Sequence, residues 1–232
     1  MDTKPDSYYR SVRDEVLGYL PDHPHTVLDV GCGEGAFGYQ VKQGRGSEVW
    51  GIELADDPAR IAAGRLDQVL CGDVAALLDQ LPPAYFDAVV FNDILEHLVD
   101  PYDVLARIKR CIRPGGVVVS SIPNIRYYPT LFDLVVRKSW EYEESGILDR
   151  THLRFFTVRS ILAMYERLGY DVLRHEGINP MPREPRHFRL ANWLLRGRIS
   201  DMRFIQFVTV ARPRQLAEDP ARSGSQAPSE GA

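Results

Sequence analysis

The chain has 232 residues, of which 44% are hydrophobic, enough for one domain with a sizeable core. Its formal net charge is -4, which excludes a global electrostatic attraction to nucleic acid. The first residues are polar, and no apolar run approaches the roughly 18 residues that span a bilayer. We therefore expect a cytoplasmic protein without a signal peptide.

The first half of the chain predicts alternating strands and helices, which implies a parallel sheet with helices on both faces. A helix is expected from about Ser7 to Leu20, where Pro21 follows. The expected strands are Thr26–Val30, Glu48–Glu53, Gln68–Cys71, Phe86–Asn92 and Val117–Ile122. Helices are expected between them at Ala36–Gln43 and at Pro101–Cys111, and a third begins at Pro58 with Asp57 as its cap. A turn is expected at Arg113–Gly116.

The alternation breaks after Pro123. Residues 123–156 form a long, aromatic insertion, and such loops in compact domains are usually functional. A helix capped by Thr157 follows, then strands at Tyr170–Gly177 and Phe204–Ala211, with an Arg-rich segment over 179–203 between them. We therefore expect an N-terminal helix or lid (1–25), one main domain (26–213) and a disordered tail (214–232).

A glycine-rich turn follows the first expected strand. Gly31, Gly33 and Gly35 let the backbone approach a ligand closely, because no Cβ intervenes. Asp29, at the end of that strand, would repel a pyrophosphate but suits a cationic ligand with an amino group. Glu53 ends the next strand, and the order strand, glycine turn, helix, strand, acid is a nucleoside-binding layout.

Several motifs follow one another in a fixed order. They are Asp29–Gly35, Glu53, Cys71–Val74, Phe86–Val90, Leu95–Pro101 and Leu105–Gly116. Together they resemble class I S-adenosylmethionine-dependent methyltransferases over roughly Tyr8 to Pro213. The resemblance implies an α/β, Rossmann-like, doubly wound seven-stranded sheet with an antiparallel last strand and an insertion after strand five. The segment Asp149–Thr157 is similar to the ubiquinone O-methyltransferase branch and to bacterial glycan or metabolite methyltransferases.

This resemblance implies S-adenosyl-L-methionine as cofactor and S-adenosyl-L-homocysteine as product. We expect Asp29 to face the cofactor's ammonium, Glu53 the two ribose hydroxyls and Asp73 the adenine amino group. Val74 would offer its backbone N–H to an adenine nitrogen. The other expected cofactor contacts are Tyr9, Gly31, Cys32, Gly33, Gly35, Leu54, Asn92, Asp93 and His97.

The same residues have local alternatives. Asp29 would instead cap the following helix, Glu53 would be a solvated strand end, and Asp73 would be only a turn residue. Tyr8 and Tyr9 either cover the cofactor or pack the first helix onto the domain.

Methyl transfer to a hydroxyl needs a base, and histidine has a suitable unperturbed pKa near 6.5. His152 is the first candidate and His97 the second, and each has a packing role as its alternative. Leu95 and His97 are expected to begin the acceptor wall. The remaining histidines lack carboxylates at ligand spacing, so we expect no metal. Cys32, Cys71 and Cys111 form no C-x-x-C pair and are expected to be buried core residues.

The acceptor is expected to be a small molecule or glycan, methylated on a hydroxyl rather than an amine. The insertion's aromatic residues suggest either a pocket wall or a packed subdomain or dimer contact, namely Tyr127, Tyr128, Phe132, Trp140 and Tyr142. Nucleic acid is not expected, because Asn92-Asp93-Ile94-Leu95 lacks the Asn/Asp-Pro-Pro-Tyr/Phe pattern of base-methylating relatives. The oligomeric state stays open, a homodimer included.

The Arg-rich segment alternates arginines with apolar residues. A solvated basic face is its default interpretation. Two others are a phosphate-bearing acceptor, such as a nucleotide- or lipid-linked sugar, and an anionic membrane surface. Two rival functions also remain for the whole chain. One is an NAD(P)-dependent oxidoreductase, because Gly33–Gly38 matches G-x-G-x-x-G, and the other is a non-catalytic S-adenosylmethionine-binding protein.

Overall fold

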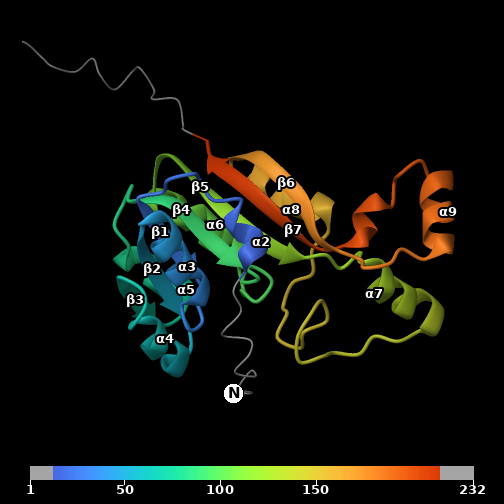
Figure 1. Ribbon diagram of the computed structural model, residues 1–232, viewed down its shortest axis with the longest axis horizontal. Helices are drawn as coiled ribbons and strands as arrows, with labels where there is room; N and C mark the ends of the chain where they lie inside the picture. Colours follow the sequence, from blue (N-terminus) through green and yellow to red (C-terminus); the bar gives the residue numbers. More distant parts are fainter. Residues whose placement is uncertain (1–12, 215–232) are drawn as a thin grey trace, which may run out of the picture.

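A seven-stranded sheet forms the centre of the computed structural model, which describes residues 13–214 (Figure 1). The strand order is β3-β2-β1-β4-β5-β7-β6. The strands are β1 (Thr26–Val30), β2 (Glu48–Glu53), β3 (Gln68–Cys71), β4 (Phe86–Asn92), β5 (Ile112–Pro123), β6 (Tyr170–Pro180) and β7 (Phe204–Pro213). β1 to β5 are parallel, while β7 is antiparallel to both β5 and β6. The predicted fold class is confirmed, including the antiparallel last strand.

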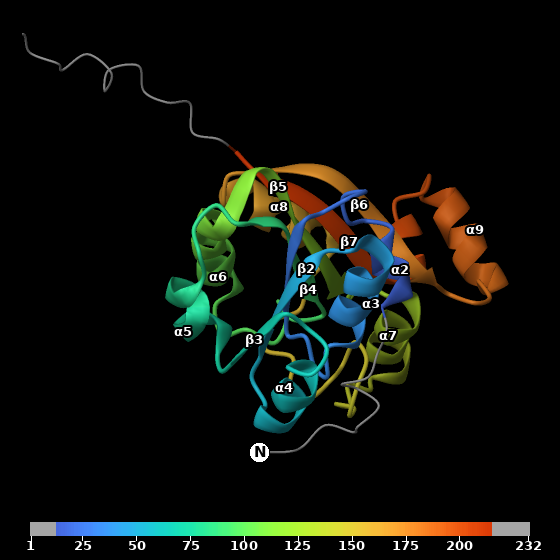
Figure 2. The same ribbon diagram turned by 60° about the vertical axis from the view of Figure 1, so that its left-hand side comes forward.

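Helices cover both faces of this sheet (Figure 2). One face packs against α2 (Asp14–Leu17), α3 (Ala36–Arg45) and α4 (Asp56–Ala62). The other packs against α5 (Val74–Leu77), α6 (Pro101–Ile108) and α8 (Val158–Arg167). Three single 3₁₀ turns complete the connections, at η1 (Leu78–Gln80), η2 (Lys109–Cys111) and η4 (Ser200–Arg203).

The central strand β4 shows why this arrangement forms. Val89 and Phe91 point into the cluster beneath α5, α6 and α8, whereas Ala88 and Val90 point into the cluster beneath α2 and α3. Because both faces of the strand are buried, its sequence is almost continuously apolar. The apolar face of each surrounding helix supplies the other half of each cluster.

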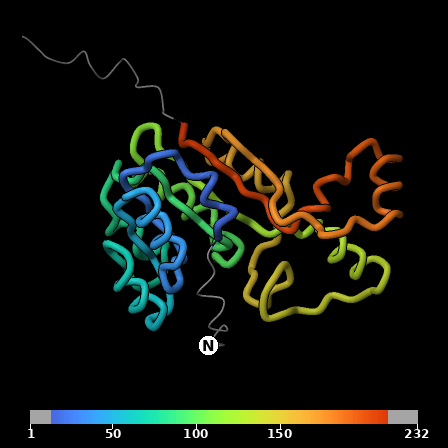
Figure 3. Tube along the Cα trace, viewed as in Figure 1, coloured from blue at the N-terminus to red at the C-terminus, as the bar shows by residue number. Residues whose placement is uncertain are grey.

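A lobe extends beyond the end of the sheet (Figure 3). We define the lobe as residues 124–139 and 181–203, which contain α7 (Tyr128–Phe132), the π-helical turn η3 (Asp133–Arg137) and α9 (Arg186–Leu194). The rings of Tyr128 and Phe188 lie 5.0 Å apart and hold α7 against α9. Arg126 donates to the Asp201 carboxylate at 2.8 Å and ties the base of the lobe together.

Three local predictions are wrong. The α4 cap is Ala55, not Asp57, whose carboxylate pairs with Arg60 instead. The turn expected at residues 113–116 lies inside β5, where the pairing with β4 shifts register. Cys71 is exposed and its thiol contacts Asp56, because this edge strand has no neighbour to cover it. Between residues 13 and 214, no helix has both the length and the apolarity needed to cross a membrane.

Candidate functional site

The glycine turn lies between β1 and α3. The amides of Gly31 and Cys32 donate to the Ile52 carbonyl at 2.7 and 3.0 Å, which fixes the turn to β2. Gly31, Gly33 and Gly35 all have positive φ, a region that side chains disfavour. A Cβ on Gly31 would also overlap the Ile94 side chain. The turn therefore needs glycine both for its conformation and for the space above it.

Glu53 is the buried acid that supports this turn. One carboxylate oxygen accepts from the Gly33 amide at 2.9 Å, and the other accepts from the Ala55 amide at 3.0 Å. The side chain is buried, so the alternative of a solvated strand end is wrong. A carboxylate oxygen has two lone pairs, so each still has capacity for a ligand hydroxyl.

Asp29 lies beside Glu53 and is buried. Burial, followed by the charge of Glu53, raises the pKa of Asp29 to about 7, although a hydrogen bond from the Gly38 amide opposes the shift. The N-cap residue of α3 is Gly35, but Gly38 lies in the first turn of this helix, so its bond to Asp29 agrees with the capping alternative. In the described chain, Asp29 Oδ2 has no hydrogen-bond partner. Such an atom is costly unless a ligand satisfies it.

The other expected cofactor residues follow the ends of adjacent strands. After β3, Asp73 Oδ1 accepts from the amides of Ala75 and Ala76 and caps α5, a helix-capping role that the turn alternative did not include. Val74 begins this helix with its side chain buried, and Leu54 is exposed after β2. At the end of β4, both polar atoms of the Asn92 amide are buried without a partner among residues 13–214. These orphaned atoms fit a nucleoside ligand with a cationic amino group.

Asp93 joins the two ends of the described chain. Its carboxylate accepts from Arg13 and from Gln206 Nε2, the latter at 2.9 and 3.0 Å. Gln206 also accepts from Arg13 at 3.0 Å. Arg13 and Gln206 are 80 and 113 residues from Asp93, so no local pattern indicated either residue.

A pocket opens next to Asp93, on the β4–β5–β7 side of the sheet. It is lined by Asp93, Glu96, His97, Pro123, Gly146, Ile147, Asp149, His152, Ile205 and Gln206. The structure thus brings both predicted base candidates to one wall, although they are distant in sequence. Pro123 and Ile147 show that the insertion after β5 forms part of this pocket, as expected.

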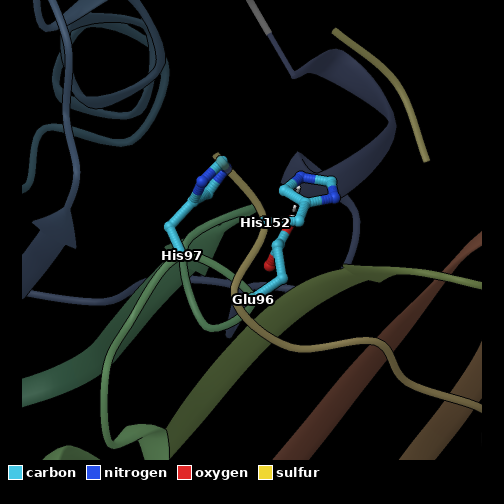
Figure 4. A group of neighbouring side chains, drawn as sticks. All are labelled: Glu96, His97 and His152. Atoms are coloured by element: carbon cyan, nitrogen blue, oxygen red, sulfur yellow. Dashed lines mark ion pairs between the residues drawn. The ribbon is translucent and has the colours of Figure 1, made fainter. Parts of the chain in front are cut away.

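The two histidines have assignable tautomers (Figure 4). His152 Nδ1 lies 3.0 Å from the Ile147 carbonyl, which can only accept, so Nδ1 carries the proton. His97 Nδ1 likewise donates toward the Thr151 carbonyl at 3.2 Å and hydroxyl at 3.0 Å. In the neutral rings Nε2 is therefore the basic nitrogen. The two rings lie edge to face, with centroids 4.6 Å apart.

Glu96 is a pocket residue that the sequence did not reveal. Its buried carboxylate lies 3.9 Å from His152 Nε2. Its backbone carbonyl accepts from the amides of Leu153 and Arg154 at 2.9 and 3.0 Å, which holds the insertion against the end of β4. Glu96 follows an apolar strand and precedes His97, but a solvated carboxylate in a loop would have the same local sequence.

Glu96, His97 and His152 also resemble a metal-ligand set. Each offers one ligand atom, and these three atoms lie within 4.8 Å of one another. One carboxylate and two imidazoles suit a first-row transition metal. The expectation of no metal considered the remaining histidines and not this cluster, and it stays a prediction that metal analysis of the purified protein can test.

Four other expectations have different outcomes. Leu95 lies in the core and does not line the pocket. Tyr128 and Phe132 pack with His187 in the lobe, so the packed-subdomain alternative is right for them. Tyr9, like Tyr8, lies outside the described residues. Cys32 is buried as expected, and burial raises the pKa of its thiol, which keeps it protonated.

Together, the mostly parallel sheet, the glycine turn and the acids at the strand ends define a Rossmann-like fold with the layout of a nucleoside-binding site. The sequence matches the family described as a methyltransferase domain over residues 2–175. The chain belongs to this family and is an S-adenosylmethionine-dependent methyltransferase, so the oxidoreductase alternative is wrong.

Individual relatives agree with the family. The chain is 38% identical over 177 residues to a ubiquinone biosynthesis O-methyltransferase of Pseudomonas entomophila, covering 72% of each protein. It is 33% identical over 178 residues to the enzyme of that name in Pseudomonas paraeruginosa, covering 72% of this chain and 73% of the relative. The crystal structure of an S-adenosylmethionine-dependent methyltransferase from Archaeoglobus fulgidus superposes with a TM-score of 0.65 at 20% identity, covering 89% of this chain and 94% of that one.

Proposed function

We propose that this methyltransferase acts on a hydroxyl of a small-molecule or glycan acceptor, with an amine as the less favoured nucleophile. The observation that carries the proposal is His152, which lines the pocket and whose Nδ1 is fixed by the Ile147 carbonyl. A hydroxyl nucleophile must lose a proton, and this nitrogen can take it. The name of the Pseudomonas relatives, an O-methyltransferase, supports the same acceptor atom.

The residues at the strand ends would hold the cofactor, which supplies an electrophilic methyl group on a sulfonium. Glu53 accepts the ribose hydroxyls while its other lone pairs hold the amides of Gly33 and Ala55. Asp29 pairs with the cofactor's ammonium, and the second oxygen of Asp73 accepts from the adenine amino group. The Asn92 amide, with two orphaned atoms, bonds the cofactor at the strand end nearest the pocket.

The acceptor would enter the pocket between β4, β7 and the insertion. His152 would take the proton that the acceptor hydroxyl loses when the cofactor supplies its methyl group. Glu96, 3.9 Å from His152 Nε2, stabilises the imidazolium that forms. Holding the two reactants in line is worth roughly 7–11 kcal/mol in favourable cases, which leaves little other work for the protein.

The charge of the pocket favours an uncharged acceptor. Its walls contain the carboxylates of Asp93, Glu96 and Asp149, and none of its lining residues in the described chain is Lys or Arg. Asp93 is paired with Arg13, but no lining residue among those described is itself a cation that would bind a phosphate beside these carboxylates. The phosphate-bearing acceptor suggested by the Arg-rich segment is therefore disfavoured inside this pocket.

Transfer of radiolabelled methyl tests the proposal. The protein is incubated with labelled S-adenosylmethionine and matched phenols, sugars and amines, and products are identified by mass spectrometry. We expect labelled ethers from hydroxyl acceptors. Labelling of amines alone would contradict O-methylation. Binding of S-adenosylhomocysteine without transfer to any member of the panel would favour the non-catalytic alternative.

Cofactor binding should depend on pH through Asp29. Its pKa of about 7 means that it is mostly protonated at pH 6 and mostly ionised at pH 8. Because the ionised form pairs with an ammonium, we expect S-adenosylhomocysteine to bind about tenfold more tightly at pH 8 than at pH 6, measured by calorimetry. In Asp29→Asn this pH dependence should disappear. Equal wild-type affinities at the two pH values would contradict the assignment.

The raised pKa of Asp29 should also affect the stability of the ligand-free protein, in a direction that can be worked out. The folded protein keeps a proton on Asp29 up to about pH 7, whereas the unfolded chain loses it near pH 4. This residue therefore lowers the free energy of unfolding progressively as the pH rises from about 4 to 7. Asp29→Asn should remove this decrease in the free energy of unfolding between about pH 4 and 7. Thermal unfolding at several pH values can measure the difference.

A further inference from the structure

The outward face of α9 is an exposed mixture of apolar and basic side chains. Trp193 is 75% exposed and Leu190 is 58% exposed. Arg186, Leu190 and Trp193 are spaced by four and three residues, so they lie on one face of the helix. Phe188 is buried against Tyr128 on the opposite face, which fixes the orientation of α9 on the lobe.

Further exposed residues extend this face. Leu194 is 64% exposed beside Trp193, and Arg189 lies on the other flank. We call the exposed arginine and apolar residues of α9, with the three exposed arginines that flank the helix in the chain, the α9 face, namely Arg183, Arg186, Arg189, Leu190, Trp193, Leu194, Arg196 and Arg198. All are exposed. A large aromatic ring and two leucines in water are unfavourable unless something covers them.

The charge of the α9 face is not neutralised by its own segment. Residues 179–203 contain six arginines and only two carboxylates. Both carboxylates are already engaged, Glu184 with Arg203 at 3.3 Å and Asp201 with Arg126 at 2.8 Å. Among residues 13–214, no carboxylate forms an ion pair with the five arginines of the α9 face. This positive charge is local, because the whole chain has a net charge of -4.

We propose that the α9 face docks on an anionic phospholipid bilayer. Arginines at the rim would contact lipid phosphates, while Trp193, Leu190 and Leu194 enter the boundary between headgroups and acyl chains. A helix with this division of side chains lies in the plane of the interface, and each arginine adds attraction to anionic lipid. An anionic bilayer complements the α9 face in two ways: its negative charge attracts the arginines, and its apolar layer accepts the exposed apolar side chains.

A second copy of the chain fits this face less well. A two-fold dimer pairs the same patch on both subunits, so the arginines of one copy would face those of the other. Like charges at such an interface are unfavourable. A bilayer surface covers the same apolar side chains and supplies opposite charge.

The lobe joins the sheet next to the pocket. The chain leaves β5 at Pro123 and returns to β7 at Phe204, and both Pro123 and the neighbouring Ile205 line the pocket. Figure 1 shows α9 at the extremity of the lobe, on the side of the molecule away from β3. Docking through α9 would therefore hold the acceptor pocket close to the membrane and leave the glycine turn away from it. The docking does not depend on which acceptor the pocket takes.

Vesicle flotation with the full-length protein tests this inference. We expect binding to vesicles of equal parts phosphatidylcholine and phosphatidylglycerol, and none to pure phosphatidylcholine. Replacing Arg186, Arg189 and Arg196 together with glutamine should lower the partition coefficient on the order of 100-fold, since each arginine contributes about fivefold. The matched control replaces the exposed Arg60, Arg159 and Arg167 with glutamine, which changes the net charge equally but on α4 and α8.

The apolar part of the inference has its own readout. Brominated lipids should quench the fluorescence of Trp193, and Trp193→Phe should remove that quenching. Retained S-adenosylhomocysteine binding shows that each variant is folded. The proposal would be overturned if the α9 triple variant and the control triple variant bound vesicles equally well. It would also be overturned if the wild-type protein did not bind anionic vesicles at low salt. A third result would also overturn it: the protein does not bind vesicles but self-associates, and Trp193→Ser abolishes the self-association. In that case a second copy of the chain would cover the α9 face.

Discussion

Glu53→Ala is expected to weaken S-adenosylhomocysteine binding on the order of 100-fold, which corresponds to about 2.7 kcal/mol. The carboxylate accepts the amides of Gly33 and Ala55, so its removal leaves the glycine turn without its support as well as removing the proposed ribose contact. Hydrogen bonds to charged groups are worth roughly 1.5–3 kcal/mol each, so the loss of two or more accounts for this magnitude. Isothermal titration calorimetry measures it directly.

Glu48→Ala is the matched control, because Glu48 begins the same strand that Glu53 ends. Its carboxylate accepts from the Trp50 indole and the Tyr85 hydroxyl, at the opposite end of β2 from the turn. We expect it to reduce thermal stability and to leave S-adenosylhomocysteine affinity close to that of the wild type. Near-native affinity in Glu53→Ala would remove Glu53 from the site.

His152→Ala is expected to lower kcat by roughly 10²–10⁴-fold, the usual contribution of a positioned base. Affinity for S-adenosylhomocysteine should stay near its wild-type value, because the ring belongs to the acceptor pocket and not to the glycine turn. Steady-state kinetics with a hydroxyl acceptor found by the labelling experiment measures the first quantity, and calorimetry the second. The calorimetric value also shows that the variant is folded.

Two histidine variants separate a base from a packed ring. His175→Ala removes a ring that stacks on Phe207 in the last hairpin, away from the pocket, and should leave kcat unchanged. His97→Gln removes the second candidate base. A large loss of kcat in His97→Gln together with an active His152→Ala would transfer the base role to His97. Equal, small losses in both would contradict general-base catalysis by either ring.

The regular part of the fold was predictable because its signals are local. The strands β1 to β4 were predicted with their observed bounds, since each is a short apolar run that ends at a turn residue or an acid. The Thr157 cap was also a local signal and is confirmed, and the structure adds a capping box with Ser160. By contrast, α5 has four residues, too few to show a helical period, and α9 was hidden because arginines interrupt its apolar pattern.

The glycine turn was visible in sequence because its residues are consecutive, whereas on the acceptor side only His97, His152 and the insertion were predicted. Glu96 and His152 meet only after the insertion folds back onto the end of β4. Asp93 is held by Arg13 and Gln206 from the opposite ends of the described chain. Nothing in the neighbourhood of any of these residues encodes such a partner, because long-range contacts depend on the topology and not on local propensity.

The sheet order also separates the two halves of the site along the chain. The acids and glycines assigned to the cofactor lie within residues 29–92, and their strands are neighbours in the sheet. The acceptor pocket also needs β7, which supplies Ile205 and Gln206. Substitutions after residue 92 can therefore change the acceptor while the earlier segment keeps the cofactor, so one inherited N-terminal half can serve many acceptor specificities.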